Sequence, residues 1–145
     1  MNTIKVKKYS DVIEEIVAAG TITPGMLVEL DTTGEVKAHS DEDGNVLPMF
    51  ALEDELQGKT IDDNYVATDP VQVWIPYRGD QVNAILATGE NVTIGTFLTS
   101  DGTGKLHAAP ALASTGDVAP SQIVGVATEA VNAASADARI IIRIV

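Results

Sequence analysis

An internal repeat is the feature that most constrains how this chain can fold. The segment Ile22–His39 (ITPGMLVELDTTGEVKAH) returns seventy residues later as Val92–Ala109 (VTIGTFLTSDGTGKLHAA), and the two copies align without a gap. The identical pairs are Thr23/Thr93, Gly25/Gly95, Asp31/Asp101, Thr33/Thr103, Gly34/Gly104 and Ala38/Ala108. The apolar pairs are Leu27/Phe97, Val28/Leu98 and Val36/Leu106. Two unrelated hairpins also share turn residues, but here the agreement continues through the strands, which favours a duplication.

Each copy has the pattern of a β-hairpin. A Thr-x-Gly turn precedes a short strand, an Asp-x-Thr-Gly turn follows, and a return strand completes the unit. The Asp side chain can accept hydrogen bonds from the backbone two residues on, and Gly supplies the positive φ that such a turn requires. We therefore predict two equivalent hairpins at the centre of the two halves.

Further short apolar segments follow the same order in both halves. Strands are expected at residues 49–56, 71–77, 80–89, 123–131 and 138–145. Residues 10–19 (SDVIEEIVAA) are ambiguous, with a helix capped by Ser10 or irregular structure favoured over a strand. A polar loop is expected at 57–70, long enough to suggest a contact surface or mobility, and a loop of small residues and prolines at 109–122.

These patterns predict an all-β protein, a small β-barrel or sandwich with an internally duplicated hairpin unit. Its length of 145 residues suits one domain. We expect an extended N-terminal arm at 1–9 and a single β domain at 10–145, with halves of about 10–77 and 78–145. The arm alternates Ile4 and Val6 with lysines, and it lies outside the repeat, so no partner strand within the domain is evident.

Charge and composition exclude several classes of function. The net charge is −12, and residues 29–69 hold twelve acidic residues against two lysines. This disfavours nucleic-acid binding. The chain has no cysteine, hence no disulfide and no thiolate zinc site. No signal peptide and no membrane-spanning segment is evident.

Motifs that resemble reactive sites have simpler interpretations. His39-Ser40-Asp41 has the letters of a catalytic triad, but neighbours on an extended chain point to opposite faces. His39 and His107 lie at nearly equivalent positions, yet two histidines alone make a poor metal site. The acidic turn 41–44 lacks the spacing of a calcium loop. Arg78-Gly79-Asp80 spells an integrin-binding tripeptide, although a turn is the simpler interpretation. We expect a protein that is not an enzyme and has no cofactor and no metal.

The run Ile22–Asp54 resembles the core of head decoration proteins of lambda-type bacteriophages. The second half is similar to capsid cement proteins of tailed phages. The motifs shared there are the strand beginning at Gly79, the Val92–Gly95 turn, the Gly-containing hairpin, the Ile-Val-Gly-Val-Ala strand and the hydrophobic terminal strand. The two resemblances together cover roughly residues 20–145. The chain departs from the lambda type in its second hairpin half and its lysine-bearing arm.

The resemblance implies a β-tulip domain that forms a homotrimer on the outer surface of the virion. Such a viral protein, made in the bacterial host cytoplasm, stabilises the phage head by clamping neighbouring major capsid subunits. The arm would add a strand to the shell, with Ile4, Lys5, Val6, Lys7 and Lys8 as the capsid-binding residues; no nucleic acid and no membrane would take part. The alternative is a β-sandwich adhesion or carbohydrate-binding module of a phage fibre or cell surface, using the acidic loop at 57–70. A third, enzymatic reading would pair two carboxylates among Glu53, Asp54 and Glu55.

Overall fold

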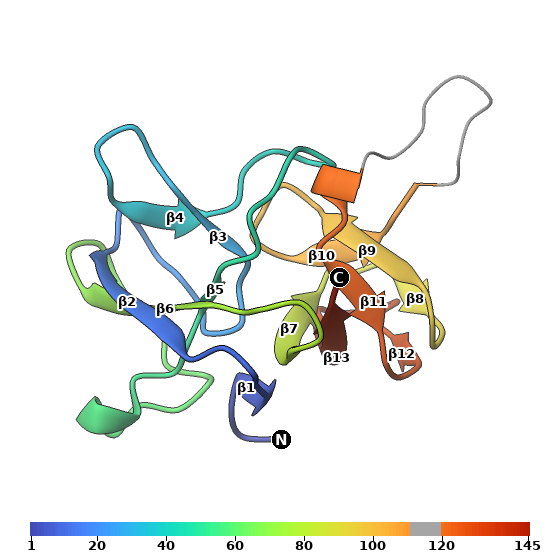
Figure 1. Cartoon of the computed structure of the whole chain (residues 1–145), viewed down its shortest axis with the longest axis horizontal. Coiled ribbons are helices and arrows are strands. Elements are labelled where there is room, and N and C mark those ends of the chain that lie inside the picture. Colours follow the sequence, from blue (N-terminus) through green and yellow to red (C-terminus); the bar gives the residue numbers. More distant parts are fainter. Residues whose placement is uncertain (111–119) are drawn as a thin grey trace.

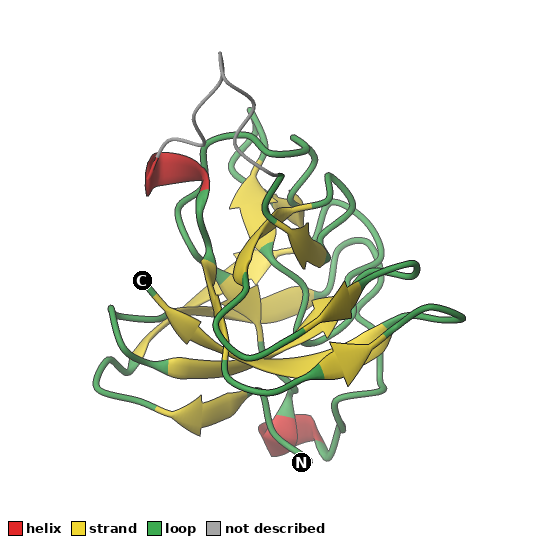
Figure 2. Ribbon diagram, turned by 90° about the vertical axis from the view of Figure 1, so that its right-hand side faces the viewer, coloured by secondary structure: helices red, strands yellow, loops and turns green. Residues whose placement is uncertain are grey.

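A computed structural model describes residues 1–110 and 120–145 (Figures 1 and 2). The part of the chain so described is all-β, with two 3₁₀ helices and no α-helix; none of its helices has the length and hydropathy needed to span a membrane. The strands are β1 Lys5–Lys7, β2 Val12–Val17, β3 Val28–Leu30, β4 Val36–Ala38, β5 Phe50–Ala51, β6 Pro70–Ile75, β7 Gln81–Leu86, β8 Asn91–Val92, β9 Phe97–Ser100, β10 Leu106–Ala108, β11 Gly125–Ala127, β12 Val131–Asn132 and β13 Ala138–Ile144. The 3₁₀ helices are η1 Glu55–Gln57 and η2 Pro120–Gln122. Most of the loop expected at 109–122 lies outside the described residues.

The C-terminal half is a closed five-stranded barrel. Its strands follow each other in the order β7-β10-β9-β11-β13, and β13 pairs with β7 to complete the ring. Every residue of β7 is buried, because β13 covers one edge along its full length and other strands cover the opposite edge. Closure leaves no free edge within the ring itself.

The N-terminal half repeats this arrangement. β2, β6 and β5 form one sheet, and β3 and β4 form the hairpin. Two single bridges link these pieces: Leu27 with Phe50 joins β3 to β5, and Ala18 with Val36 joins the end of β2 to β4. The cyclic order β2-β4-β3-β5-β6 therefore matches β7-β10-β9-β11-β13 element by element, as the duplication predicts.

The two hairpins have the same register and the same turn. Val28 pairs with Ala38 in the first, and Leu98 pairs with Ala108 in the second. A carboxylate oxygen of Asp31 accepts the N–H groups of Thr33 (2.8 Å) and Glu35 (3.0 Å). Asp101 accepts the corresponding bonds from Thr103 (2.8 Å) and Lys105 (3.1 Å). Gly34 and Gly104 have φ of +84° and +81°, which confirms the predicted turn chemistry.

The halves are packed against each other across a shared core. Leu27, Phe50 and Trp74 come from the N-terminal half, yet they belong to the apolar cluster that fills the C-terminal barrel. The guanidinium of Arg139 also crosses between the halves, donating to the carbonyls of Pro24 (2.6 Å) and Ile61 (2.8 Å). The halves are placed beside each other in Figure 1, the first to the left and the second to the right.

Two sequence expectations are wrong. Residues 12–17 form strand β2, not a helix. The apolar pattern was misleading because most side chains of β2 are exposed on both faces, so the strand lacks the usual alternation of buried and exposed residues. Of the single strand expected at 49–56, only the two residues of β5 are a strand, and η1 begins at Glu55. The strands expected at 71–77, 80–89 and 138–145 are confirmed as β6, β7 and β13.

The expectation of an unpartnered N-terminal arm is also wrong. β1 pairs antiparallel with β7, the N–H of Asn83 donates to the carbonyl of Ile4 (2.9 Å), and Ile4 is fully buried in the core. The N–H of Ile4 donates in turn to the buried carboxylate of Glu53 (3.1 Å). The arm is therefore a strand of the fold, because one apolar side chain and an open stretch of the β7 edge give it a partner.

Candidate functional site

The lysines of the arm lie on the surface but do not form a uniform strip. Lys5 and Lys8 both make ion pairs with Asp11, at 3.3 and 2.7 Å. Hydrogen bonds from Lys8 and then Lys5 lower the pKa of the Asp11 carboxyl. Lys7 is exposed and Val6 is half-buried. Of the residues expected to bind a partner, only the lysines and part of Val6 are accessible while the arm stays in place.

The end of the arm is held by Asp80. This fully buried carboxylate accepts the N–H groups of Tyr9 and of Tyr77, the latter at 2.7 Å. The N–H of Ser10 lies at 3.3 Å, and the carbonyl of Ser10 accepts from the indole of Trp74 at 3.0 Å. Arg78-Gly79-Asp80 is confirmed as a turn, and its aspartate faces the protein interior, where an adhesion receptor cannot reach it.

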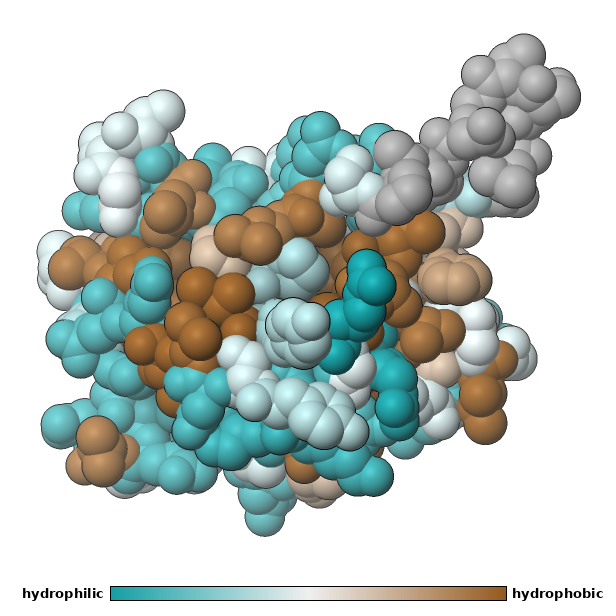
Figure 3. Space-filling model, viewed as in Figure 1, coloured by the Kyte–Doolittle hydropathy of each residue, from teal (hydrophilic) through white to brown (hydrophobic). Residues whose placement is uncertain are grey.

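The segment that follows the arm presents apolar side chains to solvent. The exposed fractions are 83% for Tyr9, 52% for Val12, 37% for Ile13 and 44% for Val17. Figure 3 shows apolar surface over the region of β2 and β6, bordered by polar side chains. Neighbouring exposed apolar residues on one strand are typical of a surface that contacts another molecule.

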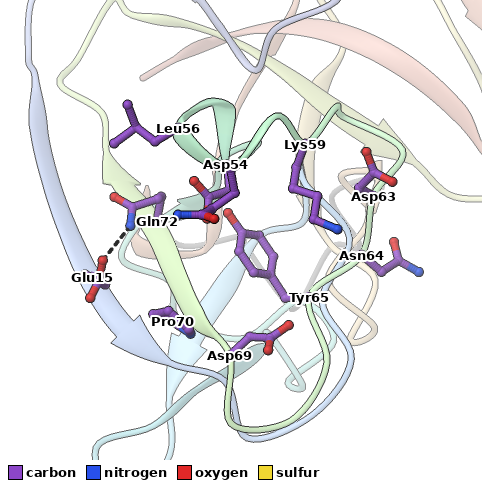
Figure 4. A pocket seen from close by; sticks show the side chains of 11 residues that line it. Glu15, Asp54, Leu56, Lys59, Asp63, Asn64, Tyr65, Asp69, Pro70 and Gln72 are labelled. Carbon is purple, nitrogen blue, oxygen red and sulfur yellow. Dashed lines mark hydrogen bonds between the residues drawn. The ribbon is translucent and has the colours of Figure 1, made fainter.

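A pocket of about 450 Å³ opens beside this strand (Figure 4). It lies between β2, β6, η1 and the loop at 57–70. Its carboxylates are Glu15, Asp54, Asp63 and Asp69. Lys59 brings a cation to the same wall. Tyr65 forms the floor: its hydroxyl donates to the carbonyl of Leu52 at 2.6 Å, and burial raises its pKa to about 12. The loop at 57–70 thus supplies much of the lining of this pocket.

The histidines do not meet at a common site. Nε2 of His107 lies 2.8 Å from Asp43, whose carboxylate also accepts the hydroxyl of Thr99 (2.6 Å). Burial alone raises the pKa of Asp43, but the bonds from Thr99 and His107 outweigh it and leave the pKa below its usual value. Glu42 places a third ligand-type atom within 4.8 Å of these two groups. Carboxylates and imidazole are common ligands of divalent cations. Here Asp43 and His107 form a hydrogen-bonded pair, and the exposed Glu42 lies beside it.

His39 has a partner that the sequence did not indicate. Its Nδ1 lies 2.8 Å from the hydroxyl of Ser100, and its Nε2 lies 3.2 Å from the carbonyl of Asn45. Ser40 instead bonds Glu29, so the adjacent letters His-Ser-Asp do not assemble. Ser100 and His39 are both buried and join the two hairpins, which gives this pair a structural role.

Comparison with known proteins leaves the family open: no known family matches the chain, and no curated protein is significantly similar in sequence. Three accessible features of the described residues are the exposed strand β2, the adjoining acidic pocket and the surface lysines of the arm. Sequence reasoning missed β2 as a surface because it favoured a helix there. The signal that could have identified β2 as a strand was the internal repeat, because extending it beyond the hairpins aligns β2 with β7.

Proposed function

We propose that this protein is a non-enzymatic decoration protein that binds the outer surface of a phage capsid and stabilises it by clamping neighbouring major capsid subunits. The observation that carries the proposal is the pair of exposed apolar side chains, Ile13 and Val17, on one face of β2. The resemblance of both hairpin regions to capsid decoration and cement proteins supplies the class of partner.

The fold suits a clamp. Apolar residues of both halves pack in one cluster, and a second cluster lies within the N-terminal half. Arg139 of the second half donates to two carbonyl groups of the first, so load applied to one half is passed to the other. We propose that the protein acts as a homotrimer on the virion, because three modest contacts combine through their effective concentration. The structural arm contributes its surface lysines to this contact while Ile4 stays in the core.

Binding to capsids tests the function directly. Expanded, undecorated capsids are assembled from the major capsid protein of the phage that carries this gene, mixed with purified protein and sedimented. We expect saturable co-sedimentation, and an Ile13→Ser/Val17→Ser variant, in which both changes lie on the same face of β2, should bind at least tenfold more weakly, about 1.4 kcal/mol. Ile94→Ser is the matched control, since Ile94 is 73% exposed and follows β8 at the opposite end of the molecule (Figure 1). Wild-type protein that stays in the supernatant at all concentrations contradicts the proposal.

The acidic pocket favours a second candidate, a carbohydrate-binding or adhesion module. Several carboxylates and an exposed Leu56 surround the opening, an arrangement that can accept sugar hydroxyls and one apolar face. Binding to a glycan array that is lost in Asp69→Ala, together with no binding to capsids, would select this candidate instead.

A further inference from the structure

The internal repeat contains a strand position that is filled in one half and open in the other. In the C-terminal half, β7 has β13 along one edge, while its other edge pairs first with β1 and then with β10. In the N-terminal half, β2 has β6 along one edge. On its other edge, the only pairing among the described residues is the bridge from Ala18 to Val36.

The registers show which residues of β2 correspond to the covered part of β7. Leu27 pairs with Phe50 and Phe50 with Trp74, as the equivalent Phe97 pairs with Val126 and Val126 with Arg143, so Ile75 stands at the place of Ile144. Val12 pairs with Ile75, and in the second barrel the N–H of Ile144 donates to the carbonyl of Asp80 at 3.0 Å. Val12 therefore stands at the place of Asp80. Counting along the strands, Ile13, Glu14 and Glu15 stand at the places of Gln81, Val82 and Asn83.

The side chains of β7 are more buried than their equivalents on β2, where the second edge is open. Gln81 is 8% exposed and Val82 is fully buried in the core, whereas Ile13 is 37% exposed and Glu14 is exposed. The N–H of Asn83 donates to β1, so the equivalent N–H of Glu15 faces the open edge. Since backbone groups alternate along a strand, those of Ile13 and Val17 face the same way.

We propose that this open edge of β2 receives an antiparallel strand from a partner protein, as β7 receives β1. An added strand forms main-chain hydrogen bonds with the edge, and alternate side chains set the specificity. The inference rests on the proposed function for the identity of the partner, a segment of the capsid shell. It adds the place where that segment binds and the chemistry of its side chains.

Charge defines the occupant. Glu14 is exposed on one face of β2, and Ile13 and Val17 are exposed on the other, so the partner strand carries lysine or arginine on the first face and apolar residues on the second, as Ile4–Lys7 of this chain does. Pairing of two copies through this edge is disfavoured in the registers that place glutamates of the two copies opposite each other. The same acidic side chains keep the edge soluble until a basic strand arrives.

The probe for this proposal is a synthetic peptide with the sequence of residues 1–9, MNTIKVKKY. In a titration followed by amide NMR shifts and hydrogen exchange, we expect the amides of Ile13, Glu15 and Val17 to shift and gain protection. Those of residues 81–83 should not change. A peptide with its three lysines replaced by glutamate should bind at least tenfold more weakly. Shifts confined to residues 81–83, which mean that the peptide only displaces β1, overturn the proposal, and so does a failure to bind at millimolar peptide.

Two substitutions at Glu15 distinguish the main-chain contribution to peptide binding from the side-chain contribution. Glu15→Pro removes the N–H that faces the open edge and should abolish peptide binding, whereas Glu15→Ala keeps the N–H and should retain most of it. If Glu15→Pro lowers the unfolding temperature, the double variant Glu14→Lys/Glu15→Lys replaces it and should prefer the glutamate peptide. Equal affinity of this variant for both peptides would refute the role of charge.

Capsids distinguish the inference from the function. If wild-type protein and Glu15→Pro bind capsids equally, the strand-addition site is wrong and the decoration function stands. If the peptide binds at β2 but wild-type protein does not bind capsids, the site stands and the proposed partner is wrong.

Discussion

Truncating Ile4 tests whether the N-terminal arm is a strand of the fold. The Ile4 side chain is fully buried in the core of the C-terminal barrel. Ile4→Ala removes three carbon groups, which at about 0.8 kcal/mol each gives about 2.4 kcal/mol, and the cavity left behind brings the expected loss to about 2–4 kcal/mol. A domain of this size has a total stability of about 5–15 kcal/mol, so the variant should fold but unfold at clearly lower urea.

Urea denaturation followed by the fluorescence of Trp74, the sole tryptophan, measures this loss. Val6→Ala is the matched control: Val6 is half-buried in the same strand, and its truncation should cost less than about 1 kcal/mol. Deleting residues 2–8 should cost more than Ile4→Ala, because it also leaves the buried carboxylate of Glu53 without the N–H of Ile4. If Ile4→Ala and Val6→Ala shift the midpoint by the same small amount, the arm is not part of the core.

The remaining predictions concern the turns and the response to acid. Gly34→Ala and Gly104→Ala should each lower the free energy of unfolding by about 1–2 kcal/mol, because alanine is strained at the positive φ of these positions. Gly104→Ala should cost clearly more in the same urea titration, because its Cβ would lie 2.9 Å from that of Ala38, whereas nothing lies within 4 Å at Gly34; equal losses would argue against the packing of the second hairpin. A hydrogen bond from Lys105, at 2.9 Å, lowers the pKa of Asp137 below its ordinary value of 3.8. The contribution of ionised Asp137 to the free energy of unfolding is therefore present above about pH 4 and is lost as the pH falls through the pKa that Asp137 has in the folded protein. Asp137→Asn should destabilise the protein at pH 7 and flatten the fall in unfolding free energy between pH 5 and 3, and an unchanged acid limb would contradict this.

Most of the fold prediction rested on the internal repeat. Asp and Gly at fixed positions in both turns determine local hydrogen bonds, and apolar residues at matching strand positions determine the register, so both hairpins were predictable from the sequence. β6, β7 and β13 were predictable because each is a short β-branched segment between turn signals. A short β5 followed by η1 was not, because Met49–Leu56 has the same apolar composition as a longer strand.

The errors lie where tertiary pairing overrides the local pattern. β2 has the apolar spacing of an amphipathic helix, but its hydrogen bonds to β6 make it a strand, and its exposed faces remove the alternation that identifies one. The arm belongs to the fold through a single buried side chain and the edge of a strand with which its residues pair at separations of 77 (Lys5 with Val82) and 74 (Lys7 with Gln81), which no local signal reveals. Similarly, Ser100 and His39 become neighbours only when the two hairpins pack together.

The most direct test of the account is a cryo-EM reconstruction of expanded capsids saturated with this protein. We expect trimers on the local three-fold axes, with β2 facing the coat protein and a basic strand of the shell continuing the β2–β6 sheet. Density for isolated monomers scattered over the hexamer faces, or capsids that remain bare at saturating protein, would contradict it.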